Sequence, residues 1–354
     1  MINKSSFFHF FIFSSLLLLA SCDSIGLYFA SKKTTINSEN SIVYIPSNSS
    51  LSDVYKLLEK AEILEDSDVF FSIAEYKNLN DDRIGAGKYE IAANMLIKDL
   101  LNAFTLNSLG NGNKELEVTV TFNNCRTIYD LAGKVGNQLE LDSSLLINYI
   151  KDESFLAKHQ LNEKTVGILF LPDSYRMFWD TDEIAFMDRM VENFSRFWNK
   201  ERKEKIKSIG LKNPNEVVTL ASIVYKEQDK HPSEWRTIAG LYLNRIKNGW
   251  LLQSDPTFVF CWGDKLKEIK RLTYEHRSID CPYNTYKYAG LPPGPIYLPP
   301  AQVIDAVLNA EENNYFYMCA KPAGNGLHNF ANSLSEHNKN AKAYQNWLSK
   351  NKIR

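Results

Sequence analysis

The chain has 354 residues, of which 44% are hydrophobic and 23% are charged, and its formal net charge is −1. This length favours two or three domains over one core, and the balance of residue types is that of an ordinary globular protein. A nearly neutral chain carries no general attraction for polyanions, so nucleic acid is excluded as an expected partner.

The N-terminus has the features of a secretory signal. Lys4 precedes an apolar run from Phe7 to Ala20, and small residues follow. The tetrapeptide LASC, which ends at Cys22, resembles a bacterial lipobox. That resemblance implies that Cys22 is lipidated and becomes the mature N-terminus.

The alternative for residues 1–22 is an uncleaved membrane anchor. The apolar segment Ile25–Ala30 extends the first run, and together they approach the ~20 residues that span a bilayer. Asp23 opposes this alternative because a carboxylate is costly in lipid. Either anchor places the folded part in the cell envelope, extracytoplasmic (periplasmic) and tethered to a membrane by the linker 23–41.

Four further cysteines leave two alternatives open. They fit no metal template, since none forms a C-x-x-C or Cys/His run, and we expect no metal site. In an exported protein Cys261 and Cys281 are the most plausible disulfide pair. Buried free thiols, at these positions and at Cys125 and Cys319, are the interpretation that we favour.

The first folded segment, 42–105, mixes strand and helix patterns. Strand patterns occupy 41–46 and 84–92, and helical patterns occupy 50–64, 70–79 and 95–104.

A second small α/β segment, 115–181, follows a polar linker. A strand is predicted at 116–122 and a helix at 127–139, and 165–179 resembles a strand that runs into an aromatic turn. The stretch 182–210 has apolar residues at helical spacing and predicts one long connecting helix.

The next helix carries a carboxylate on its apolar face. Leu220, Val224 and Glu227 are spaced by four and three residues, so they share one side of a helix. A partly desolvated carboxyl has a raised pKa and can donate a proton to a leaving oxygen. The alternative is an ordinary ion pair between Glu227 and Arg236 or Arg245.

Polar and aromatic motifs follow this helix. A second amphipathic helix is predicted over Ser233–Gly249. The stretch GLPPGPI within Cys281–Pro299 cannot form regular structure, because its prolines fix φ and its glycines permit sharp reversals. Such a rigid, extended segment suits the wall of a groove, and the nearby YNTY places amide, hydroxyl and aromatic groups together, as sugar-binding sites do.

The order ASIVxxE, NRIxxGxxLQSDPT, PYNTYxxxGLPPGPI and GLHNFANSLSEHN resembles the endolytic murein transglycosylases, the YceG-like family. The resemblance implies an α+β, multi-domain protein. Its expected parts are a LysM-like α/β subdomain at 42–105, the segment 115–181, the connecting helix 182–210 and a mixed α+β catalytic domain at 211–350.

The family's catalytic glutamate corresponds to Glu227, although Tyr225 stands where many members have a first glutamate. The resemblance implies cleavage of the β-1,4 bond between N-acetylmuramic acid and N-acetylglucosamine within a peptidoglycan strand. Glu227 would protonate the glycosidic oxygen and then, as a carboxylate, take the proton from the muramic acid 6-hydroxyl. That hydroxyl attacks its own anomeric carbon and leaves a 1,6-anhydro end. One acid without a cofactor suffices, because no water has to be activated by a second carboxylate.

Six residues are predicted to contact substrate: Gln253, Asp255, Asn284, Thr285, Tyr286 and His328. Asp255 could instead be a turn residue or helix cap. The three residues of the YNTY motif could equally lock their loop. His328, placed in a polar loop, could bind substrate or orient Glu227. It lies nine residues before His337, the wrong spacing for a metal site on one helix face.

The implied partners are peptidoglycan glycan strands, peptidoglycan synthases and the membrane that holds the N-terminal anchor. A tethered enzyme of this kind would terminate nascent glycan elongation. Two alternatives are a non-catalytic peptidoglycan-binding envelope lipoprotein and a hydrolytic muramidase that uses water.

Overall fold

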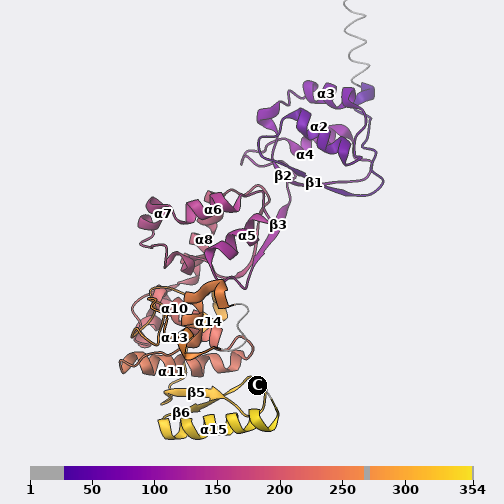
Figure 1. Ribbon diagram of the computed structural model, residues 1–354. Helices are drawn as coiled ribbons and strands as arrows, with labels where there is room; N and C mark the ends of the chain where they lie inside the picture. The colour runs from indigo at the N-terminus through magenta and orange to yellow at the C-terminus, as the bar shows by residue number, and fades with distance from the viewer. Residues whose placement is uncertain (1–27, 267–271, 353–354) are drawn as a thin grey trace, which may run out of the picture. The chain divides into compact units, whose positions relative to one another are not determined.

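The computed structural model describes residues 28–266 and 272–352 (Figure 1). Cys22 and the predicted signal segment lie outside these residues. The described part of 1–120, with 138–140 and 176–181, forms a compact N-terminal unit. The described residues of 121–137, 141–175 and 182–354 form a C-terminal unit. No helix in the described ranges is long and apolar enough to cross a membrane.

The N-terminal unit packs three helices with a two-stranded antiparallel sheet. Its elements are β1 (Ser41–Ile45), α2 (Leu51–Lys60), α3 (Ser67–Tyr76), the short 3-10 helix η1 (Asp81–Arg83), β2 (Gly87–Ile91) and α4 (Ile97–Phe104). Ser41 pairs with Ile91 and Ile45 with Gly87 across the sheet. Ser50 caps α2 in a capping box with Asp53. The strand and helix predictions for this segment are confirmed.

The segment that follows contains more helix than predicted. Its elements are β3 (Glu117–Phe122), α5 (Ile128–Gly136), α6 (Ser143–Ile150), α7 (Glu153–Lys158), the 3-10 helix η2 (Val166–Leu169) and β4 (Asp173–Phe178), and β3 pairs with β4. The prediction for 165–179, a strand that runs into an aromatic turn, is wrong in both parts, because η2 occupies the first and the strand β4 the second. All four residues of η2 are buried, and a short buried apolar run cannot be distinguished as strand or helix from sequence.

The predicted long helix at 182–210 is also wrong. Two helices, α8 (Glu183–Phe197) and α9 (Lys200–Ser208), replace it. The backbone leaves helical geometry at Trp198, whose side chain is buried, and Asn199 then caps α9 by accepting from the Arg202 amide at 3.0 Å.

The core of the C-terminal unit surrounds α10 (Pro214–Glu227). Every residue from Val217 to Val224 is buried. A helix that is buried on all sides needs apolar residues all round, so its amphipathic pattern is weak. Its neighbours include α14 (Ala301–Leu308) and α11 (Trp235–Lys247).

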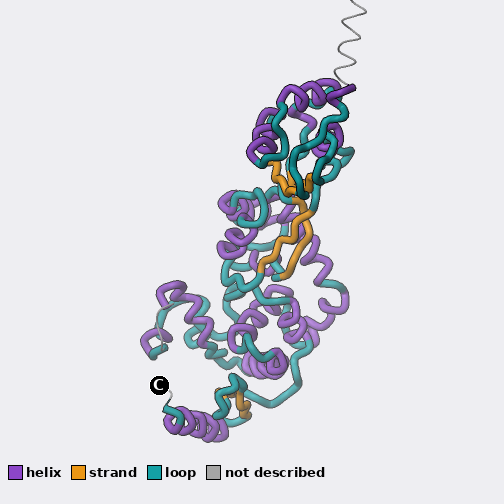
Figure 2. Tube along the Cα trace, turned by 90° about the vertical axis from the view of Figure 1, so that its right-hand side faces the viewer, coloured by secondary structure: helices purple, strands orange, loops and turns teal. Residues whose placement is uncertain are grey.

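The remaining elements of this unit build the region beyond α11. They are η3 (Pro232–Glu234), α12 (Asp255–Trp262), η4 (Gly263–Leu266), α13 (Tyr274–Arg277), β5 (Tyr317–Ala320), β6 (His328–Ala331) and α15 (Leu334–Lys350). The strands β5 and β6 pair antiparallel and lie against α15 in both views (Figures 1 and 2). Between α13 and α14 the proline-rich stretch forms no regular structure, as predicted.

A disulfide joins α12 to the segment after α13. Cys261 and Cys281 are bonded, with their Cα atoms 6.2 Å apart. Cys125 and Cys319 are free, and Cys125 is buried. The preference for buried free thiols is therefore wrong for Cys261 and Cys281 and correct for Cys125, whereas Cys319 is free but only half-buried.

Candidate active site

A cavity of about 560 Å³ opens in the C-terminal unit. Elements far apart in the sequence line it, from the ends of α10 and α12 to β5, β6 and α15. Glu227 and four of the six residues predicted to contact substrate line this cavity. The four are Gln253, Asp255, Tyr286 and His328.

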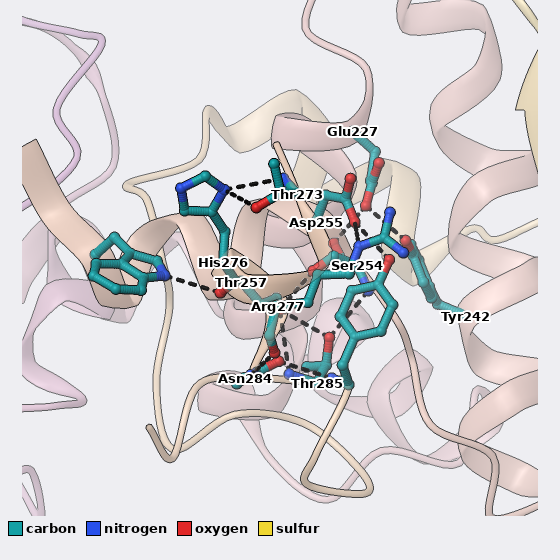
Figure 3. Close-up of polar contacts among 12 residues, drawn as sticks. Glu227, Tyr242, Ser254, Asp255, Thr257, Thr273, His276, Arg277, Asn284 and Thr285 are labelled. Carbon is teal, nitrogen blue, oxygen red and sulfur yellow. Dashed lines mark hydrogen bonds and ion pairs between the residues drawn. The ribbon is translucent and has the colours of Figure 1, made fainter. Parts of the chain in front are cut away.

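Glu227 is the last residue of α10 and faces this cavity. Its Oε1 accepts hydrogen bonds from the Tyr242 hydroxyl, at 2.8 Å, and from the Ser254 hydroxyl (Figure 3). Its Oε2 makes no hydrogen bond to any described residue and is not sealed from solvent. One carboxylate oxygen is thus anchored, and the other is open to a ligand.

Burial raises the pKa of Glu227 above that of an ordinary glutamate. The hydrogen bonds from Ser254 and Tyr242 act in the opposite direction because they stabilise the carboxylate. The negative charge of Asp255 adds to the rise, and a positive charge on His328 reduces it. The net direction is upward, which keeps the carboxyl protonated to higher pH than in water and suits a proton donor.

The alternative of an ordinary ion pair at Glu227 is not supported. Arg245 donates to the backbone carbonyls of Phe316 and Leu252, each at 2.7 Å, and Arg236 donates to the carbonyl of Asn309 at 2.6 Å. These contacts of both guanidinium groups are thus to backbone carbonyls and not to the Glu227 carboxylate.

Asp255 is engaged by two neighbours rather than free. Its Oδ1 accepts a hydrogen bond from the Tyr286 hydroxyl at 2.5 Å and lies 3.7 Å from Arg277 Nε. The Arg277 guanidinium also sits over the Tyr286 ring, 5.0 Å from its centre. Asp255 is the first residue of α12 and not its capping residue, a position that Ser254 occupies.

Gln253 has a φ of 54°, in the left-handed region. Its backbone N–H donates to the Thr285 carbonyl at 3.1 Å, which ties the segment before α12 to the YNTY loop. This conformation places Gln253 on the cavity wall.

Asn284 and Thr285 lie beneath the wall and not in it, with 0% and 1% exposure. Asn284 Nδ2 donates to the carbonyls of Arg277 and Ile279, both at 2.8 Å. Thr285 Oγ1 accepts from the Ser254 amide at 3.1 Å and lies 2.8 Å from Thr257 Oγ1. Of the two roles left open for these residues, this burial and these hydrogen bonds favour locking the loop over direct contact with substrate.

The YceG-like family model matches residues 43–343. The chain belongs to the YceG-like family. It is 28% identical to a Bacillus subtilis protein named endolytic murein transglycosylase, over 88% of this chain and 85% of that one. A Streptococcus pneumoniae protein of the same name is 27% identical over 86% of this chain but only 58% of its own length. A solved YceG-like protein of Listeria monocytogenes is 25% identical, with a TM-score of 0.54, and the match covers 86% of this chain and 99% of that one.

In this YceG-like chain His328 lies in β6 and not in a loop. Its Nδ1 is 2.8 Å from Glu234 Oε2, a partner that sequence reasoning missed. Tyr242 and Ser254, the two groups that anchor Glu227, were missed as well. Ser254 lies inside the LQSDPT motif, so the motif itself was a signal, whereas nothing in the sequence pairs Tyr242 with a residue 15 positions earlier. Among the described residues no group of three or more His, Cys, Asp or Glu is placed to hold a metal ion.

Proposed function

We propose that this YceG-like protein is an endolytic lytic transglycosylase. It cleaves the β-1,4 bond between N-acetylmuramic acid and N-acetylglucosamine within peptidoglycan strands and leaves a 1,6-anhydro end. The observation that carries the proposal is the position of Glu227, whose Oε1 is anchored by Tyr242 and Ser254 and whose side chain lines the cavity. The names of the relatives support the substrate and the reaction class.

In the first step Glu227 donates its proton to the glycosidic oxygen, and the bond from that oxygen to the anomeric carbon breaks. In the second step the muramic acid O6 bonds to the same carbon and loses its proton. The Glu227 carboxylate left by the first step is one base that can accept it. Hydrolytic enzymes usually need a second carboxyl group about 5 to 10 Å away. Asp255, the other acid in the wall, is committed to Tyr286 and Arg277, which favours the scheme with one acid.

The cavity wall supplies groups that suit a sugar chain. We propose that Gln253, Tyr286 and His328 contact the substrate directly. Asp255 acts by holding the Tyr286 hydroxyl, and Asn284 and Thr285 fix the loop that carries Tyr286.

The wider role follows from the same reaction. An enzyme that cuts within strands would terminate nascent glycan elongation beside peptidoglycan synthases. A lipid on Cys22, or a single membrane span, would hold it in the cell envelope. The βααβ order and antiparallel pairing of β1 and β2 support the proposal that 42–105 is a LysM-like, glycan-binding subdomain.

The test is digestion of purified glycan strands with wild type, Glu227→Gln and Glu204→Gln, followed by mass analysis of the fragments. Glu204 lies exposed on α9, so its variant makes the same chemical change away from the cavity. We expect anhydro-muramic fragments from wild type and Glu204→Gln and none from Glu227→Gln. Reducing ends from wild type would identify a hydrolytic muramidase. Binding without any cleavage would identify a binding protein.

A further inference from the structure

A buried carboxylate holds the imidazole that faces the cavity. Glu234 ends η3 and is only 7% exposed. Its Oε1 accepts from the His328 backbone amide at 2.9 Å, and its Oε2 lies 2.8 Å from His328 Nδ1. Gln228 Nε2 donates to the same Oε2 at 2.8 Å and to the Gly326 carbonyl, also at 2.8 Å. Glu234 is therefore fixed on both of its oxygens.

This arrangement decides which nitrogen of His328 carries the proton. Burial alone would raise the pKa of Glu234, but the hydrogen bonds from His328 and Gln228 prevail and lower it. An ionised carboxylate only accepts hydrogen bonds, so His328 Nδ1 carries a hydrogen. In the neutral imidazole Nε2 is then an acceptor. It makes no hydrogen bond to the described residues and is not sealed from solvent, in a side chain that lines the cavity.

The pair is connected to the candidate acid. Gln228 directly follows Glu227, so the residue after the acid also positions Glu234 and, through it, His328. Glu227 and His328 line the same cavity.

The substrate offers one hydroxyl that matches this acceptor. In a muramic acid residue inside a strand, O1 and O4 are in glycosidic bonds and O3 carries the lactyl group. Its ring therefore has one free hydroxyl, at C6, which is the nucleophile of the proposed reaction. A neutral Nε2 beside that hydroxyl would take its proton as the O6 to anomeric carbon bond forms, and a carboxylate on Nδ1 would stabilise the resulting imidazolium.

We propose that Glu234 and His328 form a base that accepts the 6-hydroxyl proton, so that Glu227 serves as the acid alone. This inference rests on the proposed function and divides its two proton transfers between two groups. The balance is complete: Glu227 loses one proton to the leaving oxygen, His328 Nε2 gains one from O6, and exchange with water restores both. His328 is the catalytic residue in this step, and Glu234 is a positioning residue.

The first measurement compares glycan cleavage by wild type, His328→Ala and His159→Ala, with and without added imidazole. His159 lies at the end of α7, outside the cavity lining. General-base catalysis contributes roughly 10²- to 10⁴-fold, so we expect a fall of that size in kcat for His328→Ala with little change in KM. Imidazole should restore part of that rate and should leave Glu227→Gln inactive. Full activity of His328→Ala would rule out His328 as the base. A loss of activity that imidazole does not restore, in a variant with unchanged thermal unfolding, would rule it out as well.

The second measurement is the pH dependence of kcat. Protonation of His328 removes the base, so wild type should lose rate at the acid limb of the profile, and that limb should be absent from the residual activity of His328→Ala. The other charged or titrating residues among those that line the cavity are Glu227, Tyr242, Arg245, Asp255, Arg277, Tyr286, Tyr317, Cys319 and His337. Glu234→Gln should lower kcat as well, because a neutral amide would not stabilise the imidazolium that forms on His328 as a carboxylate does. If the acid limb persists in His328→Ala, another group causes that limb and the proposal is wrong.

Failure of this inference is distinct from failure of the proposed function. Anhydro products from a fully active His328→Ala would show that His328 is not the base and would assign both proton transfers to Glu227. Absence of anhydro products from wild type would remove the transglycosylase itself.

Discussion

The hydroxyl of Tyr242 on α11 donates to Oε1 of Glu227 at the end of α10, across 2.8 Å. Ser254 donates to the same oxygen, so both bonds stabilise the carboxylate form and both lower the pKa that burial raises. Burial also raises the pKa of Tyr242 well above its ordinary value, so its hydroxyl remains a donor throughout the working pH range. The acidity of Glu227 is therefore set by burial and adjusted by two hydroxyl groups.

Replacement of Tyr242 by Phe should shift the pH profile of cleavage to higher pH. Loss of the hydrogen bond removes one influence that lowers the pKa of Glu227, so the acid stays protonated further into the alkaline range. The alkaline limb of kcat/KM should move upward relative to wild type. Tyr288→Phe is the matched control, because the Tyr288 hydroxyl donates to the exposed Asp280 at 2.7 Å, and its profile should be unchanged. An alkaline limb that moves to lower pH in Tyr242→Phe would contradict the assignment of that limb to Glu227.

Glu227 should also make the protein less stable as the pH rises. Its pKa is raised in the folded state, so the native protein binds more protons than the unfolded chain between the ordinary glutamate pKa and the raised value. The stabilising contribution is complete below the unfolded pKa and is lost as the pH rises through the folded one.

Glu227→Gln carries no charge and should therefore unfold at a higher temperature than wild type at neutral and alkaline pH. The difference should grow as the pH rises and shrink toward acid, and each kcal/mol corresponds to about 2–4 °C in a domain of 150–250 residues. Scanning calorimetry of both proteins across pH, with Glu204→Gln alongside, measures it. A variant that is less stable than wild type at every pH would show that the half-buried carboxylate of Glu227 stabilises the folded state.

Local sequence patterns predicted the candidate acid better than they predicted the residues that position it. The four-and-three spacing that ends at Glu227 is a property of one helix, and the structure places that residue in the cavity. The break between α8 and α9 had a local signal, the capping asparagine Asn199, which the longer apolar pattern outweighed.

The Glu234–His328 contact had no such signal. Its partners are 94 residues apart, on η3 and β6. Their meeting depends on how the chain brings β6 to η3, which is a tertiary property. The burial of Asn284 and Thr285 has the same origin, because a polar motif in an irregular loop can face a ligand or the loop itself.

The disulfide between Cys261 and Cys281 should stabilise the wall that carries Asp255 and Tyr286. Asp255 begins α12, which Cys261 also belongs to, and Tyr286 lies in the segment that Cys281 opens. The bond closes a loop with a sequence separation of 20, for which chain entropy predicts about 3 kcal/mol of stabilisation. Reduction of the wild type should therefore lower its unfolding temperature and raise KM for glycan strands, because the Tyr286 hydroxyl would be held less firmly.

The Cys261→Ser, Cys281→Ser double variant is the control, since it should show the lower unfolding temperature from the start and no response to reductant. Identical unfolding temperatures for oxidised wild type and the double variant, with thiol titration confirming the oxidised bond, would show that the crosslink adds nothing to the hydrogen bonds of Asn284 and Thr285.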